Sequence, residues 1–167
     1  MPATDFARMP DDARVWVFAA ARALHDDEQR QLLDRVDGFL AGWAAHGAPV
    51  LGARDLRYDR FLLVAADERA TGVSGCSIDT LSHAVAALER ETRVPMRDAT
   101  LVFWRNDDGE VQCAPRPVFR DHVREGGVDG DTPVFDNTVT TVGDLRAGWE
   151  KPLRDSWHAR AFRLGDP

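Results

Sequence analysis

One short segment, residues 71–80, contains the side chains best suited to chemistry. Cys76 follows a glycine-containing loop and precedes a predicted helix for which Ser77 is a suitable N-terminal cap. Free backbone N–H groups and the helix dipole at such a terminus attract anions and favour the thiolate form of a nearby cysteine. We therefore predict a small-molecule or anion pocket here, with Cys76 as the thiolate nucleophile. Its ligand-binding residues would be Ser74, Gly75 and Ser77.

Helical spacing adds partners for this cysteine. Asp79 and His83 are four residues apart, so they share one helix face and can touch. We predict that Asp79 orients the imidazole and that His83 transfers protons. Cys76 and His83, in contrast, are seven residues apart, which corresponds to about 10 Å along a helix. A base for Cys76 would then come from elsewhere, and His46, at the end of the first predicted helix, is the candidate.

Each of these residues also has a purely structural explanation. A cysteine near a helix start is often a small packing residue, and Asp79 at the same end complements the helix dipole. His83 can be a solvated partner of that carboxylate, and His46 can bind the terminal carbonyl groups of the first helix. Two other functions therefore stay open. One is a binding protein for a small anion, without chemistry; the other is a non-enzymatic protein-interaction module that uses the surface around Trp149 and Trp157.

Several sharper motifs are incomplete. Residues 47–54 have the glycine spacing of a phosphate-binding loop, but Ala53 and Arg54 replace the required Lys-Ser/Thr pair. The two cysteines, Cys76 and Cys113, form neither a C-x-x-C pair nor a four-cysteine zinc site. No spacing specifies a metal site. We predict no nucleotide hydrolysis through this loop, no resident metal and no cofactor.

The composition indicates an ordinary globular chain. Its 167 residues are 44% hydrophobic and 29% charged, which is enough to bury a core. The net charge of -7 argues against a nucleic-acid partner, because the phosphate backbone requires a basic surface. No apolar run reaches the roughly 18 residues of a membrane span, and the first residues lack the order of a signal peptide. We expect a cytoplasmic protein without membrane association.

The basic residues are unusually uniform. Lys151 is the only lysine among the 21 basic residues, and the others are arginines. Arginine holds carboxylates and phosphates through two parallel hydrogen bonds. We nevertheless interpret the bias as an effect of codon composition, and we expect most of the arginines to be solvated.

The order of the elements that must position these residues predicts an α+β fold. We expect a strand at 14–19, a helix at 26–45, a hairpin over 50–66, a helix at 77–92, a hairpin over 100–113, a strand at 117–119, a helix at 120–125, a strand at 133–135 and a helix at 141–150. These elements would form one domain over residues 1–167. It would be a two-layer sandwich, whose mixed or mostly antiparallel sheet carries two long amphipathic helices on one face. Residues 1–11 and 165–167 would be loosely ordered.

The chain also resembles a known group of proteins. The matching segments are Trp43–Gly47, Ser74–Asp79 with His83, Phe135–Asn137, Trp149 and Ser156–Trp157. Together they are similar to a family of uncharacterised small bacterial proteins that are often automatically labelled "ABC transporter ATPase". The resemblance implies no established activity and no site residue. The label itself conflicts with the sequence, which has no phosphate-binding lysine motif.

Overall fold

The computed structural model describes residues 4–69, 72–73 and 75–165. The chain divides into two compact units, each with its own hydrophobic core. Unit 1 consists of Met1–Arg97 and Val139–Ala147, and unit 2 consists of Asp98–Thr138 and Gly148–Pro167. The single domain expected from the sequence stays a prediction.

The sheet of unit 1 is built around one buried strand. Its strand order is β1-β5-β6-β2, with β6 antiparallel to both neighbours and β1 parallel to β5. The bounds are β1 Thr4–Asp5, β2 Arg14–Ala19, β5 Leu51–Arg57 and β6 Phe61–Asp67. Every residue of β6 is buried, as its nearly continuous apolar run predicts. The hairpin predicted over 50–66 is confirmed.

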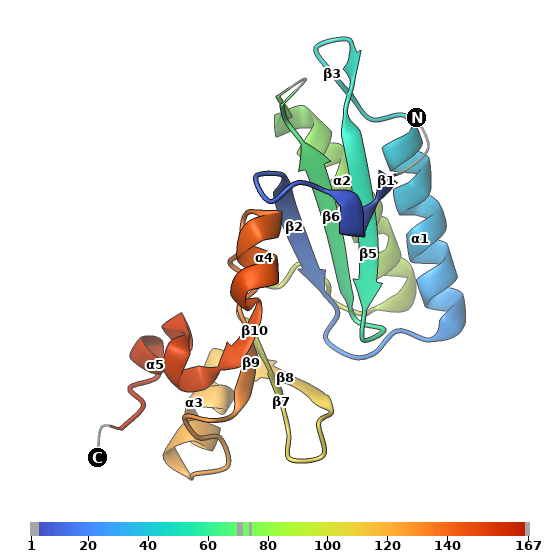
Figure 1. Cartoon of the computed structure of the whole chain (residues 1–167). Coiled ribbons are helices and arrows are strands. Elements are labelled where there is room, and N and C mark those ends of the chain that lie inside the picture. Colours follow the sequence, from blue (N-terminus) through green and yellow to red (C-terminus); the bar gives the residue numbers. More distant parts are fainter. Residues whose placement is uncertain (1–3, 70–71, 74, 166–167) are drawn as a thin grey trace. The chain divides into compact units, whose positions relative to one another are not determined.

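Two long helices of unit 1 lie on one face of this sheet (Figure 1). They are α1, Asp26–Ala41, and α2, Gly75–Thr92. The shared core takes alternate residues of β6 and one apolar stripe from each helix: Leu62, Val64 and Ala66; Leu32, Val36 and Leu40; and Leu81, Val85 and Leu88. The spacing of three and four residues in both helices thus supplies the burial that stabilises unit 1.

The first helix ends earlier than the sequence predicted. It ends at Ala41, and residues 44–49 form a small hairpin of β3, Ala44–Ala45, and β4, Ala48–Pro49. His46 and Gly47 make the turn with φ angles of 52° and 79°. Two successive positive φ angles match the right-handed twist of a tight hairpin, and glycine adopts them without strain.

Two short elements complete unit 1. They are the 3-10 turn η1, Phe6–Arg8, and the helix α4, Val142–Gly148, whose last residue belongs to unit 2. The Val15 N–H donates to the Thr140 carbonyl at 2.9 Å and so joins the segment before α4 to β2. Phe6 and Met9 are buried. This part of the N-terminal segment is therefore packed, where the sequence predicted a loosely ordered end.

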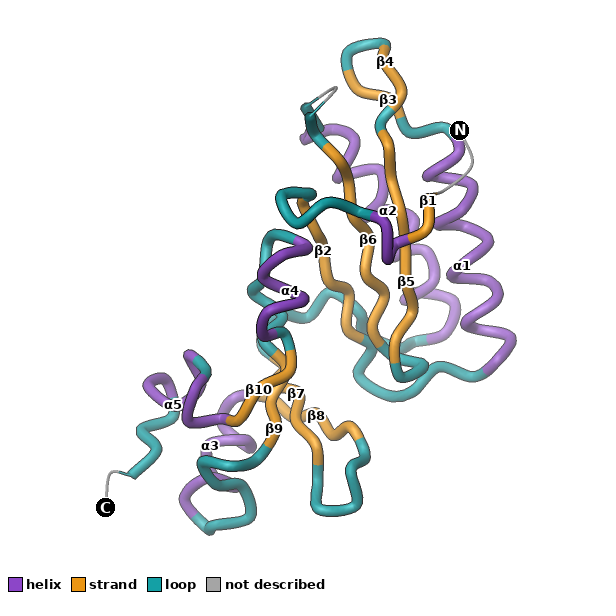
Figure 2. Tube along the Cα trace, viewed as in Figure 1, coloured by secondary structure: helices purple, strands orange, loops and turns teal. Residues whose placement is uncertain are grey.

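Unit 2 contains an antiparallel sheet and three short helices (Figure 2). The strand order is β10-β9-β7-β8, with bounds β7 Leu101–Arg105, β8 Val111–Pro115, β9 Pro133–Phe135 and β10 Glu150–Pro152. The helices are α3 Arg116–Arg124, the 3-10 turn η2 Leu153–Asp155, and α5 Trp157–Ala161. The core includes Val102, Trp104, Phe119, Val134, Leu153 and Phe162.

The α+β class and the mainly antiparallel pairing are confirmed. The described strands, however, form three separate sheets instead of the single sheet expected. Residues 117–119, predicted as a strand, belong to α3, because Pro117 fits the first turn of a helix, where its missing N–H leaves no bond unmade. The strand β10 and the helix α5 are additional. None of the described helices is both long and apolar enough to cross a membrane.

Candidate functional site

The site predicted at the start of α2 is only partly described. α2 begins at Gly75, two residues earlier than predicted, so the backbone of Cys76 is helical. Ser74 and the side chain of Cys76 lie outside the described part of the chain. The thiolate character of Cys76 and the ligand-binding role of Ser74 therefore stay predictions.

The hairpin that carries His46 lies beside the first turn of α2. The Ser77 hydroxyl donates to the Ala44 carbonyl, with 3.5 Å between the oxygens, and this contact joins α2 to β3. The sequence predicted His46 at the end of a helix, but it occupies the exposed turn of that hairpin. The structure thus brings the two segments together, and the approach of His46 to Cys76 stays a prediction.

Asp79 and His83 contact each other in a different way from the one expected. The Nδ1 atom of His83 lies 2.7 Å from the backbone carbonyl oxygen of Asp79, and that oxygen can only accept. Nδ1 therefore carries the proton and donates to the backbone, so this hydrogen bond does not involve the Asp79 carboxylate. Both side chains are exposed. The contact orients the imidazole through the helix backbone, and the proposed carboxylate–imidazole pair is not formed.

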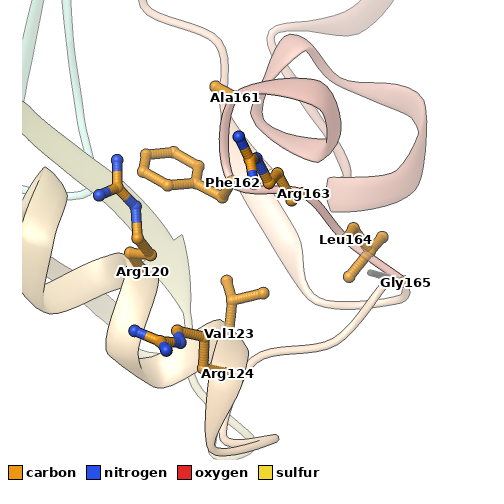
Figure 3. Close-up of a pocket in the computed structure, with 8 residues that line it drawn as sticks. All are labelled: Arg120, Val123, Arg124, Ala161, Phe162, Arg163, Leu164 and Gly165. Carbon is orange, nitrogen blue, oxygen red and sulfur yellow. The ribbon is translucent and has the colours of Figure 1, made fainter. Parts of the chain in front are cut away.

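A pocket rich in arginine lies in unit 2, and its lining includes none of the residues that the sequence singled out. It has a volume of about 640 Å³ and is formed by α3 and the segment that ends α5 and follows it (Figure 3). Its lining consists of Arg120, Val123, Arg124, Ala161, Phe162, Arg163, Leu164 and Gly165. Ligand pockets commonly have volumes of roughly 300 to 1,000 Å³. The lining contains three guanidinium groups and no carboxylate.

The sequence spacing within α3 explains part of this charge. Arg116, Arg120 and Arg124 recur every four residues, so they form one row along the helix. The next positions around the helix, Phe119 and Val123, face the core of unit 2. The amphipathic pattern thus buries one side of α3 and leaves two arginines of the row, Arg120 and Arg124, in the lining of the pocket.

The arginines of the pocket differ from many others in this chain. In the same unit, Arg105 forms a salt bridge with Glu150, and Arg154 forms one with Asp131. Among the described residues, no carboxylate pairs with Arg120, Arg124 or Arg163. Three uncompensated positive charges around one cavity favour an anionic occupant.

Aromatic packing holds the two sides of the pocket together. The rings of Phe119 on α3 and Phe162 after α5 are 4.9 Å apart, and Trp104 on β7 lies 5.1 Å from Phe119. Phe119 and Phe162 are almost completely buried. Val123 lies about one helical turn after Phe119, and Arg163 directly follows Phe162. The aromatic contact therefore fixes where both sides of the pocket lie.

A buried histidine anchors α5 in the same core. His158 is 2% exposed. Its backbone nitrogen lies 3.2 Å from the hydroxyl oxygen of Ser156, and its ring Nδ1 lies 3.0 Å from the same oxygen. That hydroxyl donates its own proton to the Leu153 carbonyl at 2.8 Å, so Nδ1 must be the donor to Ser156. Burial lowers the pKa of His158 to about 4. The ring is therefore neutral at pH 7.

A second polar cluster of unit 2 surrounds Asp136. Its carboxylate accepts bonds from the Thr138 N–H at 3.1 Å and the Trp157 indole at 3.2 Å, and Lys151 lies 3.6 Å away. Burial would raise the pKa of Asp136, but the bonds from Thr138 and the charge of Lys151 outweigh it, and the pKa is lowered. The only lysine of the chain thus has a partner that explains its position.

The two tryptophans of the predicted partner surface have different exposures. Trp149 is 3% exposed, and its indole donates to the Asn137 side chain at 2.9 Å, so its ring belongs to the interior. Trp157 is half-buried, with the guanidinium of Arg116 5.5 Å from its ring centre. Of the pair, only Trp157 offers area to a partner.

No group of three or more His, Cys, Asp or Glu side chains in the described part of the chain is arranged to hold a metal ion.

The arginine pocket itself was not predicted from the sequence. Its signal was the four-residue spacing of Arg116, Arg120 and Arg124, which the predicted strand at 117–119 concealed. Arg163 gave no comparable signal, because its place beside α3 depends on tertiary packing.

The thiolate hypothesis for Cys76 predicts fast alkylation at neutral pH. In a Cys113→Ser variant, which leaves Cys76 as the only thiol, the rate of reaction with iodoacetamide should follow an apparent pKa below the ordinary value of about 8.5. The rate is measured between pH 5 and 10, with the unfolded protein as the reference. An apparent pKa at or above that of the unfolded protein would contradict activation.

The neutral, buried His158 predicts a loss of stability in mild acid. Its pKa is about 4 in the fold and about 6.5 in an unfolded chain, so its stabilising effect is complete above pH 6.5 and declines as the pH falls towards 4. Urea unfolding at pH 7.5 and 5 should therefore show a smaller pH dependence for His158→Gln than for the wild type. The exposed His83→Gln variant is the control, and an equal effect in both variants would refute the assignment.

The comparisons with other proteins leave this geometry as the basis for function. No family model, no curated protein and no solved structure matches the chain. The resemblance to the bacterial family stays a prediction. Several of its residues, Asp136, Asn137, Trp149 and Trp157, do form one hydrogen-bonded cluster in unit 2. Any functional conclusion therefore depends on the charge and shape of the described surface.

Proposed function

We propose that this protein binds a small organic anion in the arginine pocket of unit 2. The observation that carries the proposal is the group of three guanidiniums, from Arg120, Arg124 and Arg163, that line one cavity without a carboxylate partner among the described residues. Guanidinium groups bind carboxylates and phosphates with paired, charge-assisted hydrogen bonds. The proposal keeps the expectation of a small anionic ligand but moves its site from α2 to α3.

The acidic character of the whole chain is compatible with this proposal. The net charge is -7, so distant charges repel an anion. Such long-range repulsion is screened beyond roughly 8 to 10 Å at physiological salt. Inside the pocket the charged group of the ligand would contact guanidiniums and no carboxylate. Selectivity would then come from the guanidiniums that contact the ligand directly, while the net negative charge of the chain would disfavour large polyanions.

The proposal predicts that removing one guanidinium weakens anion binding about tenfold, the equivalent of one charge-assisted hydrogen bond. Isothermal titration calorimetry would compare the wild type with Arg120→Gln and Arg163→Gln, using phenyl phosphate, benzenesulfonate, benzoate and succinate. The control is Arg30→Gln, an exposed arginine on α1 in unit 1. If no anion of this panel binds, or if the pocket variants bind as the wild type does, the proposed function is wrong.

A second candidate function uses the start of α2. The observation that favours it is the contact between Ser77 and Ala44, which places the hairpin of His46 beside the first turn of the helix. Cys76 would act as a thiolate nucleophile, with His46 as the proton-transfer group and Asp79 and His83 in supporting roles. An anionic substrate would bind the free N–H groups of the helix.

This second candidate predicts that His46→Gln slows the alkylation of Cys76 at pH 7 severalfold, because a neighbouring imidazole promotes thiolate formation. His25→Gln, at an exposed histidine just before α1 in unit 1, is the matched control and should leave the rate unchanged. Both rates are measured in the Cys113→Ser background. Equal rates in the two histidine variants would remove His46 from the site.

Three broader expectations stay part of the proposal. We infer that unit 1, with two helices on one face of its sheet, is a two-layer sandwich. We also infer that the protein acts in the cytoplasm. A protein partner would contact the half-buried Trp157 rather than the buried Trp149.

A further inference from the structure

The charge of the pocket indicates how many negative charges its ligand carries. The lining provides three guanidiniums, which are positive at every physiological pH. The acidic neighbours on α3, Asp121 and Glu125, are exposed and do not line the pocket. A monoanion would leave two positive charges uncompensated, whereas a dianion leaves one. The pocket therefore favours a group with two negative charges.

The directions of the arginines indicate the shape of that group. Arg120 and Arg124 extend from α3, whereas Arg163 comes from the segment after α5 (Figure 3). A planar carboxylate has two oxygens and is saturated by one or two guanidiniums in its plane. A phosphate monoester has three terminal oxygens in a tetrahedral arrangement and carries about two charges at pH 7. Its three terminal oxygens match the three guanidiniums of the lining in number.

The remaining lining indicates what is attached to the charged group. Val123, Phe162 and Leu164 provide an apolar side to the pocket. Phe162 is almost completely buried, so the apolar surface open to a ligand comes from the partly buried Val123 and Leu164. A free inorganic ion would leave most of a 640 Å³ pocket filled with water. An apolar or aromatic substituent would displace that water.

We propose that the ligand of the arginine pocket is a phosphate monoester of an apolar or aromatic group. This inference rests on the proposed function and specifies its ligand class. The phosphate lies among Arg120, Arg124 and Arg163, and the organic group lies on Val123 and Leu164. The phosphate remains intact, because the proposal is one of binding alone.

The test compares ligands that share one ring and differ in the charged group. Phenyl phosphate should bind the full chain at least about tenfold more tightly than benzenesulfonate, a tetrahedral monoanion, or benzoate, a planar one. Calorimetric titrations are made at pH 7.5 and one salt concentration. If benzoate or benzenesulfonate binds as tightly as phenyl phosphate, the phosphate assignment is overturned while the proposed function stands. If none of the three binds, the proposed function fails as well.

The organic group is tested with ligands that share the phosphate. Phenyl phosphate should bind about tenfold more tightly than methyl phosphate or inorganic phosphate, which lack the ring. Equal affinities would limit the site to the phosphate ion. In a Val123→Thr variant, which keeps the side-chain shape, phenyl phosphate should lose affinity while methyl phosphate does not. A parallel loss for both ligands would place the ring elsewhere.

Discussion

The contact between Phe119 and Phe162 is the interaction on which the arginine pocket depends. The two rings come from α3 and from the segment after α5, and both are buried in the core of unit 2. Burial of one such side chain contributes about 1.5 to 3 kcal/mol. Repulsion between two exposed charges at 4 Å amounts to only about 1 kcal/mol in water. The aromatic contact can therefore hold like charges around one cavity.

The same comparison explains why these arginines differ from their neighbours. Arg105 and Arg154 face carboxylates within unit 2, and such pairs remove the field of the guanidinium. Arg120, Arg124 and Arg163 project from surfaces whose other side is apolar, so the nearest core residues offer them no negative charge. The pocket thus combines positive charge with an apolar wall, which is the combination that a small amphipathic anion requires.

The start of α2 offers related chemistry with a weaker physical basis. Free N–H groups there attract anions, as in any helix. The hairpin of His46 is held beside this turn by a single contact of Ser77, and the imidazole of His83 is bound to the helix backbone rather than to the carboxylate of Asp79. A thiolate at Cys76 would have to draw its stabilisation from backbone amides and from His46.

Local patterns in the sequence were sufficient for much of the fold. The period of the apolar residues located α1, α2 and both hairpins, because burial of a stripe or of alternate residues is decided within a few positions. The end of α1 and the helix at residues 117–119 were mispredicted. In the first case residues that continue the apolar pattern of the helix form a small hairpin instead, with its turn at His46 and Gly47. In the second, Pro117 is equally compatible with an extended chain and with the start of a helix.

By itself, the sequence determined which faces of the two long helices are apolar and that Arg116, Arg120 and Arg124 are spaced four residues apart. Only the tertiary structure decided that Arg163 joins this row and that Arg105 and Arg154 are neutralised elsewhere. The physical reason is the range of the interactions. Helical phase is set by neighbours along the chain, whereas the charge balance of a pocket is the sum over segments that hydrophobic packing brings together from distant positions.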